Sequence, residues 1–153
     1  MGETSYTFGS VWHVSASPDD VFHALARPAD YPLWWPEIRD VRPRGDQTFQ
    51  LTCKSTLAFT LSVTATPIVH DRATRVLEAR LTGDLDGSCR WTVGVHATGT
   101  SATFDEEVTP QKTLLRRIGP LARPTLKASY SRMMRSGERG LRTYLAGYRA
   151  NLD

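Results

Sequence analysis

The sequence of 153 residues lacks the features that mark membrane, secreted and disulfide-stabilised proteins. None of its apolar runs approaches the roughly 20 residues that a membrane-spanning helix needs. Its start, Met1-Gly2-Glu3-Thr4, has no basic region followed by an apolar stretch, so we expect no secretory signal. The two cysteines, Cys53 and Cys89, lie in strand-like segments and are expected to be buried, reduced thiols. We therefore expect a single cytoplasmic domain, residues 1–153, large enough to bury a core.

Signatures of common catalytic and metal sites are also missing. The four histidines are scattered and no Cys/His pair has the spacing of metal ligands, so we expect neither a metal nor another cofactor. The segment Asp84-Leu85-Asp86-Gly87 is similar to the start of a calcium loop, but Val95 stands where that loop needs a bidentate acid, which favours a plain turn. The chain has neither a Gly-x-Ser-x-Gly elbow nor a glycine-rich phosphate loop. What remains is an apolar cavity with a few convergent polar groups.

Acidic residues are scarce only in the last part of the chain. Residues 1–110 contain 9 Lys and Arg against 14 Asp and Glu, a net charge of −5, whereas residues 111–153 contain 10 against 2, a net charge of +8. No nucleic-acid-binding motif accompanies this excess, and exposed aromatic residues are not interleaved with it, so no nucleic-acid partner is expected. A solvated helix face, or contact with acidic loops, is the ordinary explanation. An anionic membrane surface and an acidic carrier protein are the candidate partners.

The chain begins with a predicted strand and helix. Residues 6–14 alternate in polarity, which is typical of a strand with one buried face. That face carries Tyr6, Phe8, Trp12 and Val14, with Ser10 between them. Next, Ser17 is a good N-cap, Pro18 suits the first helical position, and acids follow at the positive helix end. A helix should therefore run from Pro18 to near Pro28.

Two adjacent indoles follow in Tyr31-Pro32-Leu33-Trp34-Trp35-Pro36, which we call the double-Trp segment. Each proline removes a backbone donor and pushes the preceding residue towards extended geometry. The segment is therefore a stiff, irregular connection, with one turn of helix before it at most. The rings either close the core at the wide end of a sheet or form a lid at a cavity mouth. We expect Trp34 and Trp35 to divide these roles, one buried and one exposed.

The rest of the chain is predicted to be an antiparallel sheet followed by a long helix. From Ile38 to Pro110 apolar residues recur with period two, in runs separated by turn residues. The last 40 residues change to helical period, and their apolar face carries Leu126, Tyr130, Met133, Gly137, Leu141, Tyr144 and Tyr148. The opposite side carries Lys127, Arg135, Arg139, Arg142 and Arg149. This helix should begin near Pro124 and reach Arg149, a length of about 39 Å.

This order of elements resembles the START and birch-pollen-allergen (SRPBCC) superfamily, and most closely its polyketide cyclase/dehydrase and lipid-transport branch. The resemblance spans nearly the whole chain and rests on Ser15-Ala16-Ser17-Pro18-Asp19-Asp20-Val21-Phe22, the double-Trp segment, Gly83-Asp84-Leu85-Asp86-Gly87-Ser88-Cys89-Arg90-Trp91 and Met134-Arg135-Ser136-Gly137-Glu138-Arg139-Gly140-Leu141. It implies an α+β helix-grip fold. In that fold a curved seven-stranded antiparallel sheet wraps around a long C-terminal helix, two short helices follow the first strand, and an apolar cavity lies between sheet and helix.

Glu106 is the acid that the strand pattern directs towards the apolar side, because it shares parity with Ala102, Phe104 and Val108. A carboxylate there costs several kcal/mol unless it is paired or protonated, which suits a general acid/base or a ligand anchor. A bulge that breaks the parity, made plausible by the neighbouring acids, would turn it outwards, and we favour this bulge slightly. The resemblance implies an aromatic residue near this position, so the acid departs from the family.

The candidate ligand-binding residues come from the double-Trp segment, the sheet and the long helix. They are Trp34, Trp35, Trp91, Phe104, Glu106, Tyr130, Met133 and Met134. A tryptophan at the start of a strand, such as Trp91, is more often core than site, and so is a Met-containing stripe at helical spacing. Tyr130 is the better candidate on the helix, because a buried hydroxyl needs a partner that a ligand could supply.

Three classes of function are consistent with these features. We favour a monomeric or homodimeric protein that binds a hydrophobic or aromatic small molecule, such as a lipid or a polyketide, in the cavity. The resemblance also implies a polyketide cyclase or aromatase that promotes aldol closure and dehydration, for which Glu106 and Tyr130 are the candidate proton acceptor and donor. A protein-interaction module would instead use the basic helix face and leave the cavity filled.

Overall fold

The structure is a computed structural model that describes residues 5–54 and 60–152, with side chains up to residue 147. Its elements, in chain order, are β1 (Tyr6–Val14), α1 (Pro18–Leu25), the 3-10 helix η1 (Pro28–Leu33), β2 (Ile38–Pro43), β3 (Phe49–Lys54), β4 (Thr60–Asp71), β5 (Val76–Gly83), β6 (Leu85–His96), β7 (Gly99–Pro110), α2 (Lys112–Ile118) and α3 (Ala122–Leu152). No described helix is long and apolar enough to cross a membrane.

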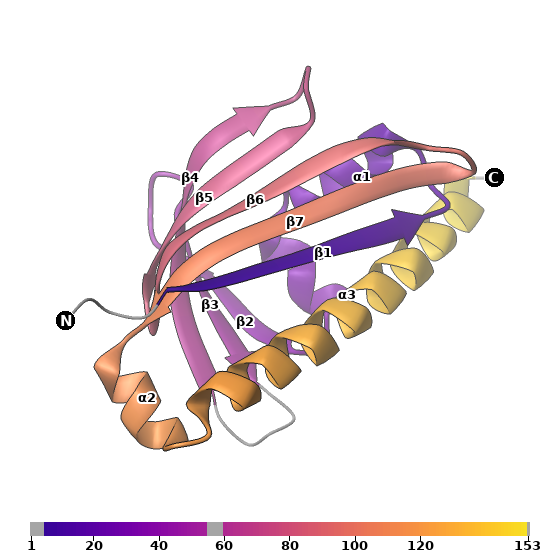
Figure 1. The fold of residues 1–153 in the computed structure, drawn as a ribbon. Coiled ribbons are helices and arrows are strands. Elements are labelled where there is room, and N and C mark those ends of the chain that lie inside the picture. The colour runs from indigo at the N-terminus through magenta and orange to yellow at the C-terminus, as the bar shows by residue number, and fades with distance from the viewer. Residues whose placement is uncertain (1–4, 55–59, 153) are drawn as a thin grey trace.

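The seven strands form one antiparallel sheet that curves around α3. The strand order is β1-β7-β6-β5-β4-β3-β2. Consecutive strands are therefore neighbours in the sheet, except for β1 and β2, which form its two edges because β1 pairs with β7. Figure 1 shows α3 lying along the concave side of the sheet beneath β1, with α2 at one end of the molecule. The predicted helix-grip fold is therefore confirmed, including the two short helices, α1 and η1, that follow the first strand.

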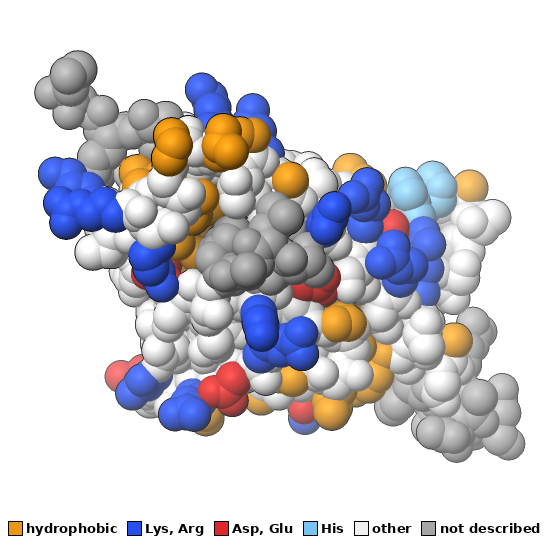
Figure 2. Space-filling model, turned by 90° about the horizontal axis from the view of Figure 1, so that it is seen from below, with side chains coloured by type: hydrophobic (Ala, Val, Ile, Leu, Met, Phe, Trp, Pro, Cys, Tyr) orange, Lys and Arg blue, Asp and Glu red, His pale blue; other side chains and the backbone are white. Residues whose placement is uncertain are grey.

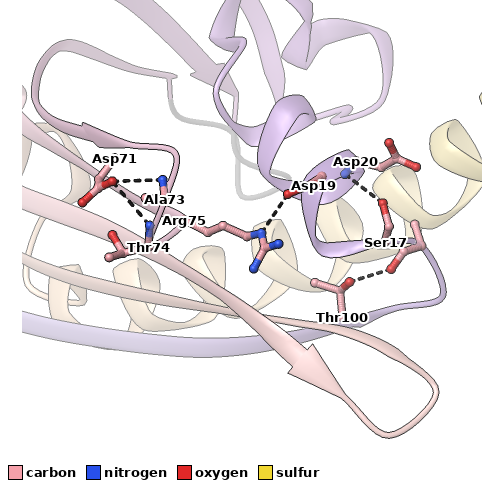
Figure 3. A network of polar contacts seen from close by, with 9 residues as sticks. Ser17, Asp19, Asp20, Asp71, Ala73, Thr74, Arg75 and Thr100 are labelled. Atoms are coloured by element: carbon pink, nitrogen blue, oxygen red, sulfur yellow. Dashed lines mark hydrogen bonds and ion pairs between the residues drawn. The ribbon is translucent and has the colours of Figure 1, made fainter.

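The start of α1 follows its sequence, and polar contacts tie the helix to the sheet. The Ser17 hydroxyl accepts a hydrogen bond from the Asp20 amide at 3.1 Å, as its N-cap position predicts. Arg75, in the turn before β5, forms a 2.9 Å ion pair with Asp19 on the first turn of the helix. The Thr100 hydroxyl donates to the backbone carbonyl just before Ser17 at 2.5 Å. Figure 3 shows these contacts holding α1 across one end of the sheet.

The C-terminal region contains one helix more than predicted. Residues 112–118 form α2, which ends where Gly119 adopts a φ of +84°, a conformation that glycine takes without strain. The long helix begins at Ala122, near the predicted start at Pro124, because a proline is tolerated in the first turn, where amides have no helical partner. Its 31 residues span about 46 Å. Tyr148 and Arg149 lie outside the residues whose side chains the structure describes.

The register of β7 is continuous, so the bulge that we slightly favoured there is wrong. Glu106 pairs with Phe8 on β1 and with Cys89 on β6, and no register shift interrupts either ladder. The alternation of β7 therefore holds to its end, and Glu106 shares the concave face with Phe104 and Val108. Its acidic neighbours, residues 105 and 107, are exposed on the outer face instead.

All four tryptophans belong to one buried cluster that closes one end of the fold. The Trp34 and Trp35 rings stack at 5.3 Å between centroids, and Trp12 meets both edge-on. The prediction that one of the pair is exposed is wrong, because Trp34 is 5% and Trp35 is 4% exposed. Both serve core closure because α3 provides a notch for them: a Cβ atom on Gly137 would lie 2.5 Å from the Trp35 ring, and one on Gly140 would lie 1.7 Å from the Trp34 carbonyl oxygen.

Candidate functional site

A cavity of about 510 Å³ lies between the concave face of the sheet and the first half of α3. This volume is within the range of ligand pockets, about 300–1,000 Å³. Most of its lining is apolar and comes from nearly every strand. Representative side chains are Phe8, Leu51, Leu81, Phe104, Leu126 and Met133. The protein-interaction hypothesis expected this space to be filled, whereas the structure has a cavity there; a role for the basic helix face stays a prediction.

The Glu106 side chain lines this cavity, and its neighbours in the sheet are apolar. Phe8 and Cys89 are its cross-strand neighbours, and Phe104 and Val108 flank it along β7. Within the described part of the chain, no hydrogen bond or ion pair satisfies its carboxyl group. Burial raises the pKa of Glu106 from 4.5 to about 7, because the apolar surroundings penalise the charged form. The group is therefore close to half-protonated at neutral pH.

Tyr130 approaches the same cavity from α3. Its ring stacks on Phe8 with 4.5 Å between centroids, and its hydroxyl lies 3.0 Å from the Ser10 hydroxyl on β1. Burial raises the pKa of Tyr130 to about 12, and the contact with Ser10 opposes that rise. Ser10 was assigned to this face from the sequence but not to the site. Its place in the middle of a strand face whose other side chains are aromatic or aliphatic is the signal that could have identified it.

Two cysteines and a second buried carboxyl group also line the cavity. Burial is the main cause that raises the pKa of Cys53 and of Cys89 to about 12, and the charge of Glu106 adds to it. These free thiols are poor nucleophiles at neutral pH, as expected for buried structural cysteines. Glu37, at the entry to β2, was missed from the sequence. One of its carboxyl oxygens is buried and, among the described residues, has no hydrogen-bond partner.

The other candidate residues divide between the cavity and the core. Trp35, Trp91, Met133 and Met134 line the cavity, and the Trp35 indole donates a 2.9 Å hydrogen bond to the Met133 carbonyl. Trp34 does not line it, because the ring packs on the far side of Trp35. Trp91 is both core and lining, since it is 6% exposed. That any of these residues binds a ligand stays a prediction.

The described residues hold no cluster of three His, Cys, Asp or Glu side chains that could bind a metal ion. The groups described above offer two carboxyl groups, Glu106 and Glu37, the Tyr130 hydroxyl with its partner Ser10, and two thiols in largely apolar surroundings. Such a set can anchor a ligand or move a proton.

Comparisons with known proteins agree with this architecture. Residues 7–145 match the family model described as polyketide cyclase/dehydrase and lipid transport. The ZhuI aromatase/cyclase from Streptomyces sp. R1128 superposes with a TM-score of 0.73 at 17% identity, covering 92% of this chain and 93% of that one. A START superfamily protein from Mycobacterium smegmatis gives 0.69 at 15% identity, covering 96% and 99%. The protein Ara h 8.0201 gives 0.68 at 14% identity, covering 94% and 99%.

Identities this low show a shared fold and do not carry over a ligand or a reaction. No curated protein sequence matches the chain. The family model, in contrast, covers the double-Trp segment, most of α3 and, except for Tyr6, the first strand and the cavity lining. The chain is a member of the polyketide cyclase/dehydrase and lipid-transport family.

Proposed function

We propose that the protein binds a hydrophobic or aromatic small molecule in the cavity under α3. The observation that carries this proposal is an apolar enclosure of about 510 Å³ that contains a carboxyl group without a protein partner. A cavity of this volume exposes apolar surface that a ligand would cover. The carboxyl group would gain from a ligand that donates a hydrogen bond to it, because a buried polar group without a partner is costly.

Filling the cavity tests this proposal. Ala79 lines it from the middle of β5, so Ala79→Phe places a ring in the ligand space, whereas Thr82→Phe on the exposed side of the same strand does not. Neutral aromatic ligands, starting with 1-naphthol, are titrated while the emission of Trp35 and Trp91 is followed, since both rings line the cavity. We expect binding to weaken at least tenfold in Ala79→Phe and to be unchanged in Thr82→Phe. Equal affinities for the two variants would contradict binding in this cavity.

A second candidate function is cyclisation of a polyketone, favoured by the convergence of Glu106 and Tyr130 on one cavity. A carboxylate with a pKa of about 7 can accept a proton from carbon between two carbonyl groups, and a hydroxyl held by Ser10 can donate to the carbonyl oxygen that gains charge. Loss of water from the aldol product needs the same two groups in reversed roles. If this reaction occurs, Glu106→Gln should abolish turnover while ligand affinity remains. If Glu106→Gln retains turnover, Glu106 is not the general base.

The basic face of α3 gives weaker support to a partner. Lys127, Arg135 and Arg139 are exposed, and Figure 2 shows Lys and Arg side chains spread over the lower face of the molecule, with Asp and Glu among them. Arg142 is engaged within the chain, because it forms a 3.3 Å ion pair with Glu138 and donates to the His13 carbonyl at 2.8 Å. These contacts fit a solvated face, and the acidic carrier protein remains a proposal that salt-dependent binding would test.

A further inference from the structure

The cavity contains two carboxyl groups that lack a protein partner. Glu106 projects from β7 and Glu37 from the entry to β2, which are far apart in the sheet order. Both raise the pKa of Cys53 on β3, after the larger effect of burial. The two acids therefore both act on the Cys53 thiol, and both line the cavity. Neither is hydrogen-bonded or ion-paired through its carboxyl group to the residues that the structure describes.

The positive groups of the lining do not neutralise this pair. Lys54, His70 and Arg132 contribute to the cavity wall, but among the described residues no ion pair joins any of them to Glu106 or Glu37. The third acid of the lining, Glu78, is already bound to Arg90 at 3.0 Å. The residues around Glu106 itself, two phenylalanines, a valine and a neutral thiol, carry no positive charge. The negative charge of Glu106 is therefore not offset by any side chain next to it in the sheet.

We propose that the cavity prefers ligands that present a protonated amine to Glu106, and that it rejects carboxylates of the same hydrocarbon length. This inference rests on the proposed function, because it concerns the ligand of the same cavity. An ammonium group would complete an ion pair in surroundings of low dielectric, where a charge-assisted hydrogen bond is strong. A ligand carboxylate would bring a further negative charge against Glu106 and Glu37. A hydroxyl ligand, which is neutral, should lie between these extremes.

A matched ligand series measures this preference directly. Decylamine, decanol and decanoate have the same chain and differ in the charge of the head group. Their affinities for the full chain are measured by isothermal titration calorimetry at pH 8, where Glu106 is mostly ionised, decylamine is protonated and decanoate is charged. We expect decylamine to bind at least 100-fold more tightly than decanoate, with decanol between them.

Two variants assign the preference to Glu106. In Glu106→Gln, which keeps the shape and removes the charge, the amine-to-carboxylate ratio should fall at least tenfold while decanol affinity changes less than threefold. In Glu107→Gln, the exposed neighbour on the outer face, all three affinities should match the wild type. Near-UV circular dichroism checks that both variants remain folded.

The outcomes separate this inference from the proposed function. If the three ligands bind with similar affinity, or decanoate binds best, the charge preference is refuted while ligand binding in the cavity stands. If the preference survives in Glu106→Gln, the assignment to this residue is refuted. If none of the three ligands binds, this inference is refuted, and the 1-naphthol titration with Ala79→Phe then decides the proposed function separately.

Discussion

Replacing Glu106 by Gln should stabilise the protein in neutral solution and leave it unchanged in acid. The native carboxyl group keeps its proton up to a pKa of about 7, whereas the unfolded chain releases it near 4.5. Between these values the native state binds more protons, so the free energy of unfolding falls as pH rises. At about 1.4 kcal/mol for each pKa difference of one, the loss reaches about 3 kcal/mol by pH 8. The neutral amide of Gln, which has the same shape, does not cause this loss of stability.

The measurement is urea denaturation of wild type, Glu106→Gln and Glu107→Gln at pH 4, 5.5, 6.5 and 8. The gain of Glu106→Gln over wild type should be near zero at pH 4 and about 3 kcal/mol at pH 8, or roughly 6–12 °C in melting temperature for a domain of this size. Taking the difference cancels carboxyl groups common to both proteins. The thiols and the buried tyrosine titrate above this range, with pKa values of about 12 for Cys53, Cys89 and Tyr130.

The reasoning fails if the difference does not depend on pH, since that would mean that Glu106 titrates as it does in water. It also fails if Glu106→Gln becomes less stable than the wild type as pH rises, because that would show that the ionised carboxylate is held by a favourable partner. Glu107→Gln should give a flat, small difference throughout, because that side chain faces solvent on the outer side of the sheet.

Three more predictions concern the supports of the site. Gly140→Ala should lower the free energy of unfolding by at least about 2 kcal/mol, because its Cβ would overlap a backbone carbonyl. Gly147→Ala has open space around its Cβ and should raise the free energy of unfolding by about 0.5–1 kcal/mol. If thermal denaturation gives the same sign for both variants, the notch is contradicted. At pH 8, Cys53 and Cys89 should react with a disulfide reagent about 1,000-fold more slowly than in the unfolded chain, and fast labelling of the native protein would exclude their raised pKa. Ser10→Ala should destabilise by about 1 kcal/mol in the same denaturation assay, because the tyrosine hydroxyl on α3 loses its partner, and no change would mean that water replaces it.

The fold could be predicted because its local signals agree with each other. Ser17 caps α1 as its position in the sequence predicts, and the alternation along each strand matches the concave and convex faces of the sheet. The alternation of side chains along β7 predicted correctly that Glu106 faces the cavity, although a run of three acids argued for a bulge. The hydrogen-bonded ladders on both sides of β7 fix the register of this strand.

The parts that escaped prediction depend on contacts between distant segments. The burial of both Trp34 and Trp35 needs the notch at Gly137 and Gly140, about a hundred residues later, and no local pattern announces it. Glu37 joined the site because the curl of the sheet brings β2 round to face β7. Helix α2 is only seven residues long, too short for a periodic signal to stand out between two prolines.

The division of α3 has a consequence for how this protein can diversify. Residues 126–134 of the helix face the cavity, whereas residues 137–145 lock onto the tryptophan cluster, with Leu141 fully buried there. Substitutions in the first stretch alter the shape and polarity offered to a ligand, while the notch at Gly137 and Gly140 that seats Trp34 and Trp35 stays intact. Ligand preference and stable folding thus depend mainly on two consecutive segments of α3. New ligand preferences can be selected, or engineered, in residues 126–134 while residues 137–145 stay constant.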